Sequence, residues 1–324
     1  MPHAPCPRPR APCPMLHSRC HGRRVRRLAL LSAVGSSSAS FTNYTLVSKT
    51  TVGSSNSQLL RFALPPGATL GGLGEGAVPV TVYARALGLK KSYSPVSRAD
   101  EAGAFDLLVK PYAPREGGGL AAHLCSLGVG KAAELQVKAT RVMHGSPGVL
   151  QRWRNLALVA GGTGIAPFVQ ILRHVLPDDA GTAVRLLYSS RNASDILMRD
   201  EIDALAAKYG PDRLGVTYVV TGDGAGAEAG EGACDEAAAP PPGAGGMVRR
   251  RIDAELLRDV LPGPAAPGTM VMVCGTDGFV DALAGPTVRA PADPVTGKKG
   301  KKEQGPLLGL LASLGYEASQ VYKF

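Results

Sequence analysis

The chain has 324 residues, which is too long for one comfortable hydrophobic core and too short for three domains, so two domains are expected. Aromatic residues make up only 5% of the sequence, which argues against the stacking surfaces that bind nucleic acid, and we expect no nucleic-acid partner. A net charge of +10 would favour a polyanionic partner only if the positive charge were spread over the folded part of the chain.

The positive charge is instead concentrated at the N-terminus. Residues 1–40 contain seven arginines and no acidic residue, whereas the rest of the chain carries 29 basic and 26 acidic residues. A segment rich in Arg and Ser that lacks acids is typical of an organelle transit peptide, so we interpret residues 1–40 as a disordered leader that directs the protein to the mitochondrion. A plastid leader, a signal or short anchor at the endoplasmic reticulum membrane surface, and a basic tail without an address remain open.

The apolar run at residues 28–34 is much shorter than the stretch of about 20 residues that crosses a bilayer, so no transmembrane span is expected. Cysteine usage excludes two further classes of structure. Beyond the leader only Cys125, Cys234 and Cys274 remain, and they are scattered. Such cysteines form neither a disulfide framework nor the paired spacing of a zinc site or a plant-type iron–sulfur cluster, and we expect no metal site.

Residues 41–152 have the pattern of a small all-β domain. Short β-rich runs are separated by clusters of Gly, Pro and Ser, and only residues 120–127 have the pattern of a helix. Short strands at this close spacing predict an antiparallel β-barrel. The predicted strands lie at residues 44–47, 58–64, 78–83, 105–110 and 134–137.

Residues 153–324 alternate strands and helices, which predicts a parallel sheet covered by helices on both faces. Residues 222–246 are almost entirely Gly, Ala and Pro with five acids, and because such a segment cannot form a core we predict a disordered insertion. The basic run at residues 298–302 is predicted to be a solvated loop. Strands are predicted at 156–160, 183–189, 215–221 and 269–274, and helices at 168–175, 200–208 and 253–260.

A glycine-rich turn follows the predicted strand 156–160 and contains Gly161, Gly162, Thr163, Gly164 and Pro167. Glycines let the backbone approach a bulky anion, and proline suits the first turn of a helix because its missing amide hydrogen would have no acceptor there. The helix N-terminus then presents free amides and a positive dipole end to a pyrophosphate. The turn differs from Gly-x-Gly-x-x-Gly because Pro167 occupies the place of the last glycine.

The string from Gly161 to Pro167 resembles the NAD(P)-binding motif of the ferredoxin-NADP reductase superfamily, and more closely that of NADH-cytochrome b5 reductases. Residues 195–201 are similar to the Asp-Ile-Leu-x-Arg segment that follows the second strand in that family. Residues 273–275, Val-Cys-Gly, are similar to the strand end near the nicotinamide, and residues 320–324 to the aromatic C-terminus. The resemblance implies a Rossmann-like α/β NAD(P)-binding domain over residues 153–324.

The first domain carries the family's second signature. Residues 91–97 resemble its Arg-x-Tyr-[Ser/Thr]-x-x-Ser flavin motif, residues 109–112 its Val-Lys-x-Tyr, and residues 117–120 the glycine stretch that wraps the flavin pyrophosphate. The resemblance implies an FAD-binding β-barrel over residues 41–152, and hence an α+β two-domain chain. The implied flavin-binding residues are Lys91, Ser92, Tyr93, Ser94, Val109, Lys110, Tyr112, Gly118, Gly119 and Leu120.

The resemblance also implies individual roles. Tyr93 packs against the flavin, Ser94 forms a hydrogen bond near its reactive nitrogen, and the cation of Lys91 faces the pyrophosphate. Three positions depart from the family's pattern: Lys91 replaces an arginine, Ala121 replaces a phosphate-binding serine, and Thr276 replaces the proline of Cys-Gly-Pro. An ammonium lacks the bidentate fork of a guanidinium, so we expect a weaker or repositioned pyrophosphate clamp at Lys91.

Cys274 has two interpretations: a side chain that orients the nicotinamide at the carboxyl end of a strand, or a small buried hydrophobic residue. Its place at the strand end favours the first, and with Ser94 it is the residue we assign to catalysis. The implied nucleotide-binding residues are Gly161, Gly162, Thr163, Gly164, Pro167, Cys274 and Gly275. NADH is the expected donor, by analogy with the family. NADPH is an open alternative, because Thr221 stands where NADH-preferring members often carry an aspartate that repels a 2′-phosphate.

These observations predict an FAD-dependent oxidoreductase that takes hydride from NADH and passes single electrons to a haem protein such as cytochrome b5. We expect a monomer that meets this or another haem or electron-acceptor protein as its partner. Two alternatives are open. One is a related flavin reductase with a quinone or another acceptor, and the other is a degenerate, non-catalytic family member that acts as an assembly or interaction module.

Overall fold

The computed structural model describes residues 40–53, 56–71, 80–111, 119–138, 153–178, 181–222, 246–292, 300 and 302–324. Residues 1–39 of the predicted leader, Tyr112, Gly118, nearly all of the predicted insertion, and residues 298, 299 and 301 of the basic run lie outside the described residues. Residues Val34–Phe324 form one compact unit. Within the described part of the chain, no helix is both long enough and apolar enough to cross a membrane.

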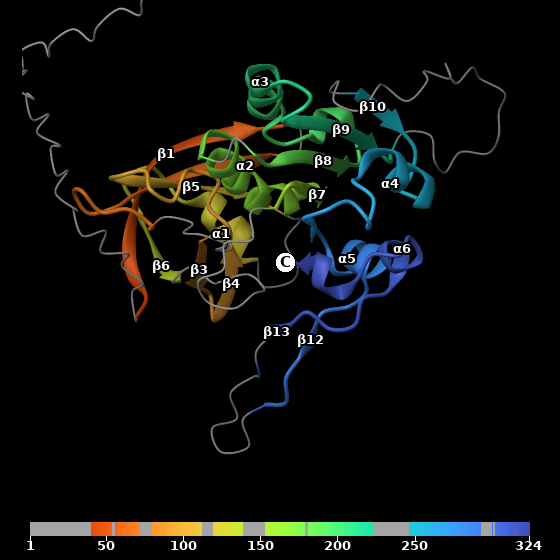
Figure 1. Cartoon of the computed structure of the whole chain (residues 1–324). Helices are drawn as coiled ribbons and strands as arrows, with labels where there is room; N and C mark the ends of the chain where they lie inside the picture. Colours follow the sequence, from red (N-terminus) through yellow and green to blue (C-terminus); the bar gives the residue numbers. More distant parts are fainter. Residues whose placement is uncertain are drawn as a thin grey trace, which may run out of the picture. The chain divides into compact units, whose positions relative to one another are not determined.

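The first domain is a six-stranded sheet in the order β4-β3-β6-β1-β2-β5, in which all neighbouring strands are antiparallel (Figure 1). Pro95, which follows β4 at one edge, forms an antiparallel bridge with Leu107 of β5 at the other edge, so the sheet closes on itself. The antiparallel all-β prediction is therefore confirmed. The elements are β1 Thr42–Val52, β2 Ser57–Ala63, β3 Thr81–Ala86, β4 Leu89–Tyr93, β5 Ala104–Val109, helix α1 Leu120–Ser126 and β6 Ala132–Lys138.

Strand β4 is the element of this domain that the sequence pattern did not predict as a strand. Its residues Leu89, Lys90 and Lys91 are all exposed, so the alternation of apolar and polar residues that reveals a half-buried strand is missing. A tight turn creates the strand instead. Leu87 and Gly88 have φ angles of 53° and 69°, the pair of positive values that a two-residue hairpin turn of the right-handed twist requires.

The second domain is a parallel sheet in the order β10-β9-β8-β7-β11-β14 (Figure 1). Alternate residues of β7 enter two different cores: Leu156 and Leu158 pack with α2, whereas Ala157 and Val159 pack with α4, α5 and α6. Both faces of the sheet are thus covered, as predicted. The strands are β7 Asn155–Gly161, β8 Ala183–Ser190, β9 Leu214–Val220, β10 Gly246–Arg249, β11 Thr269–Cys274 and β14 Val321–Lys323.

The helices of this domain are α2 Ala166–Asp178, α3 Arg199–Tyr209, α4 Ala254–Val260, α5 Asp277–Ala284 and α6 Gly309–Ser313, with short 3₁₀ turns at Gly162–Ile165, Ala193–Asp195 and Ala318–Gln320. Strands β12 Val288–Arg289 and β13 Lys302–Glu303 form a small antiparallel pair. The two ends of the predicted insertion belong to the fold. The amide of Gly222 donates to the carbonyl of Arg191 at 2.7 Å, and Gly246 pairs with Thr217.

We expect Leu135→Ala to lower the free energy of unfolding by about 2–5 kcal/mol, because Leu135 is fully buried in the barrel core and its loss leaves a cavity. Urea unfolding followed by circular dichroism measures the change. Leu89→Ala is the matched control, since Leu89 is 40% exposed and its truncation changes stability by no more than about 0.5 kcal/mol. Equal losses in both variants would contradict this account of the core.

Candidate functional site

The glycine-rich turn lies between β7 and α2, as the sequence predicts. Strand β7 ends at Gly161, residues Gly162–Ile165 form a 3₁₀ turn, and α2 begins at Ala166 with Pro167 in its first turn. Gly162 has a φ of 54°, and an added Cβ there would meet no atom within 4 Å. The residue therefore needs to be glycine for its conformation, and the space beside it fits an approaching phosphate group.

Gly164 has a different reason to be glycine, which the sequence did not reveal. A Cβ on Gly164 would lie 2.2 Å from the carbonyl oxygen of Cys274, a distance that no side chain can occupy. The turn after β7 thus rests directly on the end of β11. Gly275 and Gly161 both face the ring of Phe279. A Cβ added to Gly275 would lie 2.5 Å from the nearest ring atom, and a Cβ added to Gly161 would lie 3.1 Å from it. The close approach joins the turn to the strand end that carries Cys274.

Tyr188 is a site residue that the sequence analysis missed. It lies in β8 and is fully buried, and its hydroxyl donates to the carbonyl of Gly162 at 3.0 Å while it accepts from the amide of Leu197 at 3.2 Å. The glycine turn and the segment at residues 195–201 are therefore held by one phenol. A tyrosine inside an apolar strand carries no signal of such a contact, because only the tertiary structure brings Gly162 and Leu197 to it.

Cys274 is the last residue of β11, at the carboxyl edge of the sheet where the glycine turn also lies. Burial raises the pKa of its thiol to about 12, so the thiol is neutral at physiological pH and is no nucleophile. Thr276, which departs from the family's proline, caps the next helix: its hydroxyl accepts from the amide of Phe279 at 3.4 Å. Its departure from the motif thus has a structural reason.

The flavin motif occupies β4 and the residues after it. Lys91 and Tyr93 pair with Ala84 and Val82, two fully buried residues of β3, so both side chains lie on the same face of the sheet as these residues, with Lys91 exposed on the edge strand. Ser92 pairs with Tyr83 and lies on the opposite face. The side chain of Ser92 therefore points away from the face that carries Lys91 and Tyr93, so on that face Ser92 offers only its backbone groups. Ser94 follows the strand and is half-buried.

The hydroxyl of Tyr93 is buried, yet within the described residues it has no hydrogen-bond partner. Burial raises its pKa to about 12, so it is a neutral donor and acceptor. Buried polar atoms are nearly always hydrogen-bonded in proteins, and an orphaned hydroxyl beside a flavin motif fits a bound ligand that completes it. Helix α1 adds to the same side of the barrel: its N-cap is Gly119, which supplies no side-chain cap, and its first turn contains no acid.

The remaining predicted flavin residues line β5 and α1. Val109 is buried at the end of β5, and its carbonyl lies 3.8 Å from the thiol of Cys125 on α1. Leu120 is buried in the barrel core, which assigns it a structural contribution as well. Lys110 approaches Asp195 of the second domain at 3.8 Å, so the Val-Lys segment of the first domain contacts the Asp-Ile-Leu segment of the second.

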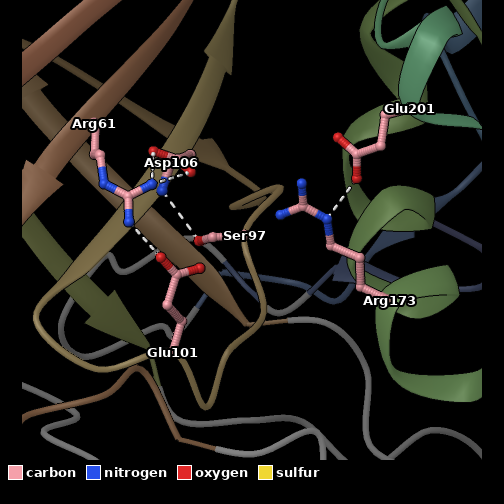
Figure 2. A network of polar contacts seen from close by, with 6 residues as sticks. All are labelled: Arg61, Ser97, Glu101, Asp106, Arg173 and Glu201. Carbon is pink, nitrogen blue, oxygen red and sulfur yellow. Dashed lines mark hydrogen bonds and ion pairs between the residues drawn. The ribbon is translucent and has the colours of Figure 1, made fainter. Parts of the chain in front are cut away.

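The last residue of the flavin motif, Ser97, is fully buried and faces the barrel. Its hydroxyl accepts from the amide of Asp106 at 3.0 Å, and the carboxylate of Asp106 binds Arg61 at 2.9 Å (Figure 2). Burial raises the pKa of Asp106, and the neighbouring guanidinium of Arg61 acts against that rise. Ser97 thus anchors the motif to β5.

The aromatic C-terminus packs at the same edge of the parallel sheet. The amide of Phe324 donates to the carbonyl of Val273 at 3.0 Å, and its ring meets that of Phe168 on α2 edge-on, with centroids 5.6 Å apart. Lys323 is buried, and its ammonium donates to the carbonyls of Pro286 and Pro306 at 3.0 Å and 2.9 Å. The bond from Phe324 holds β14 beside β11, and the bonds from Lys323 tie β14 to the chain between α5 and α6.

Comparison with known proteins finds a matching family for each of the two domains. One family model, the oxidoreductase FAD-binding domain, matches residues 43–142, and another, the oxidoreductase NAD-binding domain, matches residues 158–284. NADH-cytochrome b5 reductase 2 of Coccidioides immitis is 32% identical over 276 residues, which are 84% of this chain and 73% of that protein. NADH-cytochrome b5 reductase 2 of Meyerozyma guilliermondii is also 32% identical, over 84% of this chain and 80% of that protein.

A solved structure, the cytochrome b5 reductase domain of Ulva prolifera nitrate reductase, has the same fold. It matches with a TM-score of 0.60 at 21% identity, over 88% of this chain and 97% of that chain. The fold and the two matched domains define an oxidoreductase with consecutive FAD-binding and NAD-binding domains. Since curated relatives at 32% identity cover more than two thirds of the chain, it belongs to the NADH-cytochrome b5 reductase family.

We expect Gly164→Ala to weaken NAD binding at least tenfold and to lower stability by about 1–3 kcal/mol, because the new methyl group must push the turn away from Cys274. Titration calorimetry with NAD and thermal unfolding measure the two effects. Gly278→Ala is the matched control, since a Cβ at Gly278 meets nothing within 4 Å. Normal NAD affinity in Gly164→Ala would show that the close approach is not needed.

We expect the thiol of Cys274 to react slowly with iodoacetamide up to about pH 10 and faster only above it, because the reactive thiolate forms near its raised pKa of about 12. The same thiol in the urea-unfolded chain should react near its ordinary pKa of about 8.5. The folded state holds this proton more tightly, so its contribution to stability is present below the unfolded pKa and is lost as the pH rises toward 12. Mass spectrometry of the alkylated peptide follows both rates.

Proposed function

We propose that the protein uses FAD to take hydride from NADH and passes the electrons singly to a haem protein of the cytochrome b5 type. The observation that carries this proposal is the similarity to NADH-cytochrome b5 reductases through both domains, over 276 residues and not over one motif. The orphaned hydroxyl of Tyr93 and the open space at Gly162 support it independently. The neutral thiol of Cys274 is consistent with a role in orienting the donor.

The residues of the first domain fit a flavin. Lys91 is an exposed cation on the same face of β4 as Tyr93 and would face the pyrophosphate, while the uncapped first turn at Gly119 and Leu120 would offer backbone amides to it. Tyr93 would donate its hydroxyl to the ligand, and Ser94 would hydrogen-bond near the reactive ring. The flavin supplies the ability to accept two electrons together and release them one at a time.

The residues of the second domain fit a nicotinamide nucleotide. Gly162, Thr163 and the first turn of α2 would hold the pyrophosphate, because backbone amides there carry the positive end of the helix dipole. Cys274 and Gly275, at the end of the neighbouring strand, would border the nicotinamide. The close approach of Gly164 to Cys274 keeps these two ends of the nucleotide site in one fixed geometry.

NADH as the preferred donor is part of the proposal. Thr221 follows β9, and its hydroxyl donates to the carbonyl of Ser190 at 3.4 Å, so it adds no negative charge against a 2′-phosphate. We expect the full-length protein to oxidise NADPH measurably, and Thr221→Asp to lower kcat/KM for NADPH about tenfold with little change for NADH. Steady-state kinetics with both donors measures this. A smaller selectivity for NADH in Thr221→Asp would contradict it.

The test of the function itself uses the purified full-length chain. We expect a flavin absorption spectrum that bleaches on addition of NADH, ferricyanide reduction driven by NADH, and faster reduction of cytochrome b5 than of a quinone. A colourless protein that fails to oxidise NADH with ferricyanide would overturn the proposal. If the flavoprotein oxidises NADH but does not reduce cytochrome b5, the NADH half-reaction of the proposal holds and the proposed acceptor is wrong.

Lys91→Arg is expected to raise the fraction of flavin retained through gel filtration, because a guanidinium binds a phosphate with two parallel hydrogen bonds and an ammonium with one. The ratio of flavin to protein absorbance measures the retained fraction. Lys90→Arg is the matched control, since Lys90 pairs with Arg85 on the opposite face of the strand. An equal gain in both variants would remove the role of Lys91 at the pyrophosphate.

We also propose a mitochondrial location and a monomeric state. The first rests on the acid-free, arginine-rich composition of residues 1–40 and is tested by fusing those residues to a fluorescent reporter. A reporter in plastids or at the endoplasmic reticulum would select one of the alternative addresses, and a reporter in the cytosol would remove the transit peptide. Light scattering after gel filtration gives the mass in solution.

A further inference from the structure

Gln170 of α2 joins the nucleotide helix to the flavin motif. Its side chain is fully buried, and its Oε1 accepts from the backbone amide of Val80 at 2.7 Å. Its Nε2 donates to the carbonyls of Pro95 and Ser97 at 3.2 Å and 3.4 Å. One side chain of the second domain therefore satisfies three backbone groups of the first domain. Neither cofactor motif contains Gln170.

The same face of α2 makes two more contacts with this segment. The carbonyl of Arg173 accepts a hydrogen bond from the guanidinium of Arg98, and Nε2 of His174 accepts from the amide of Ala99 at 3.2 Å. Residues three and four positions after Gln170 share its face of the helix. Successive turns of the nucleotide helix α2 thus form hydrogen bonds with the segment at residues 95–99.

The other side of the segment is fixed to the barrel. The amide of Val96 donates to the carbonyl of Asp106 at 2.9 Å, and the hydroxyl of Ser97 accepts from the amide of Asp106 at 3.0 Å. Figure 2 shows Ser97 directed to Asp106, whose carboxylate is held by Arg61, and Arg173 on its helix bonded to Glu201. Because the segment is held between β5 and α2, a change at Gln170 acts on its position directly.

We propose that Gln170 is a positioning residue that sets the flavin motif against the nucleotide turn, and so sets the distance over which hydride moves. The inference rests on the proposed function. Ser94 immediately precedes Pro95, and the turn that ends at Pro167 opens the helix that carries Gln170. With both cofactors bound, a hydride, which is one proton and two electrons, would pass from NADH to FAD. Gln170 exchanges no proton or electron, but a misplacement of about 1 Å can slow such a step roughly 100-fold.

Stopped-flow kinetics on the full-length flavoprotein tests this. The decay of flavin absorbance is followed without oxygen over a range of NADH concentrations, which separates the limiting rate constant from the apparent Kd. In Gln170→Leu, which keeps the volume and loses all three hydrogen bonds, we expect the limiting rate to fall at least tenfold, with Kd and flavin content within about twofold of wild type. Gln170→Glu keeps the acceptor for Val80 and should give an intermediate rate, and it carries the test if Gln170→Leu does not fold.

Gln136→Leu is the matched control, because it makes the same change at a buried glutamine of the first domain, on β6, whose backbone pairs with Tyr83 of β3. Its limiting rate should stay within about twofold of wild type. The inference is overturned if the Gln170 variants transfer hydride at the control's rate. It is also overturned if their rate falls only in proportion to lost flavin, which is the result of a purely structural role. If the wild-type flavin does not bleach with NADH at all, the proposed function fails instead.

Discussion

The contact between Gly164 and the carbonyl oxygen of Cys274 is the constraint on which the nucleotide site depends. A single added methyl group would lie 2.2 Å from that oxygen, so the turn after β7 can rest on the end of β11 only without a side chain. Two segments more than a hundred residues apart in the sequence are thereby fixed as one surface, with backbone amides at one end and Cys274 at the other. Gly161 and Gly275, both facing the ring of Phe279, extend the same close packing.

The flavin half depends on a second constraint, the closure of the barrel beside the motif. The bridge between Pro95 and Leu107 and the two hydrogen bonds to Asp106 hold the residues that follow Tyr93 and Ser94. Arg61 compensates the carboxylate of Asp106, whose pKa burial raises. Because Gln170 binds the same short segment from α2, this segment is held by hydrogen bonds from both domains.

The departures from the family's motifs have unequal explanations. Thr276 replaces a proline and caps the N-terminus of α5 through its hydroxyl, so the chain passes directly from the end of β11 into a capped helix. Lys91 lies on the edge strand β4, where a longer guanidinium would also fit the exposed position, and nothing in the structure explains the replacement of arginine there or of serine by Ala121. At the C-terminus, burial lowers the pKa of Lys323, yet its ammonium keeps carbonyl acceptors at Pro286 and Pro306 and so ties β14 to the chain between α5 and α6.

The sequence by itself determined the two-domain order, the antiparallel and parallel classes of sheet, and the turn from Gly161 to Pro167, because apolar periodicity and glycine are local signals. It did not reveal β4, whose exposed residues lack alternation, or β10, a four-residue strand at the end of the insertion, and α5 was not predicted either. Only the tertiary structure decided why Gly164 must be glycine, that Ser97 faces Asp106, and that Tyr188 and Gln170 hold the site. Each of these depends on atoms that distant segments bring together, and no spacing along the chain encodes such a contact.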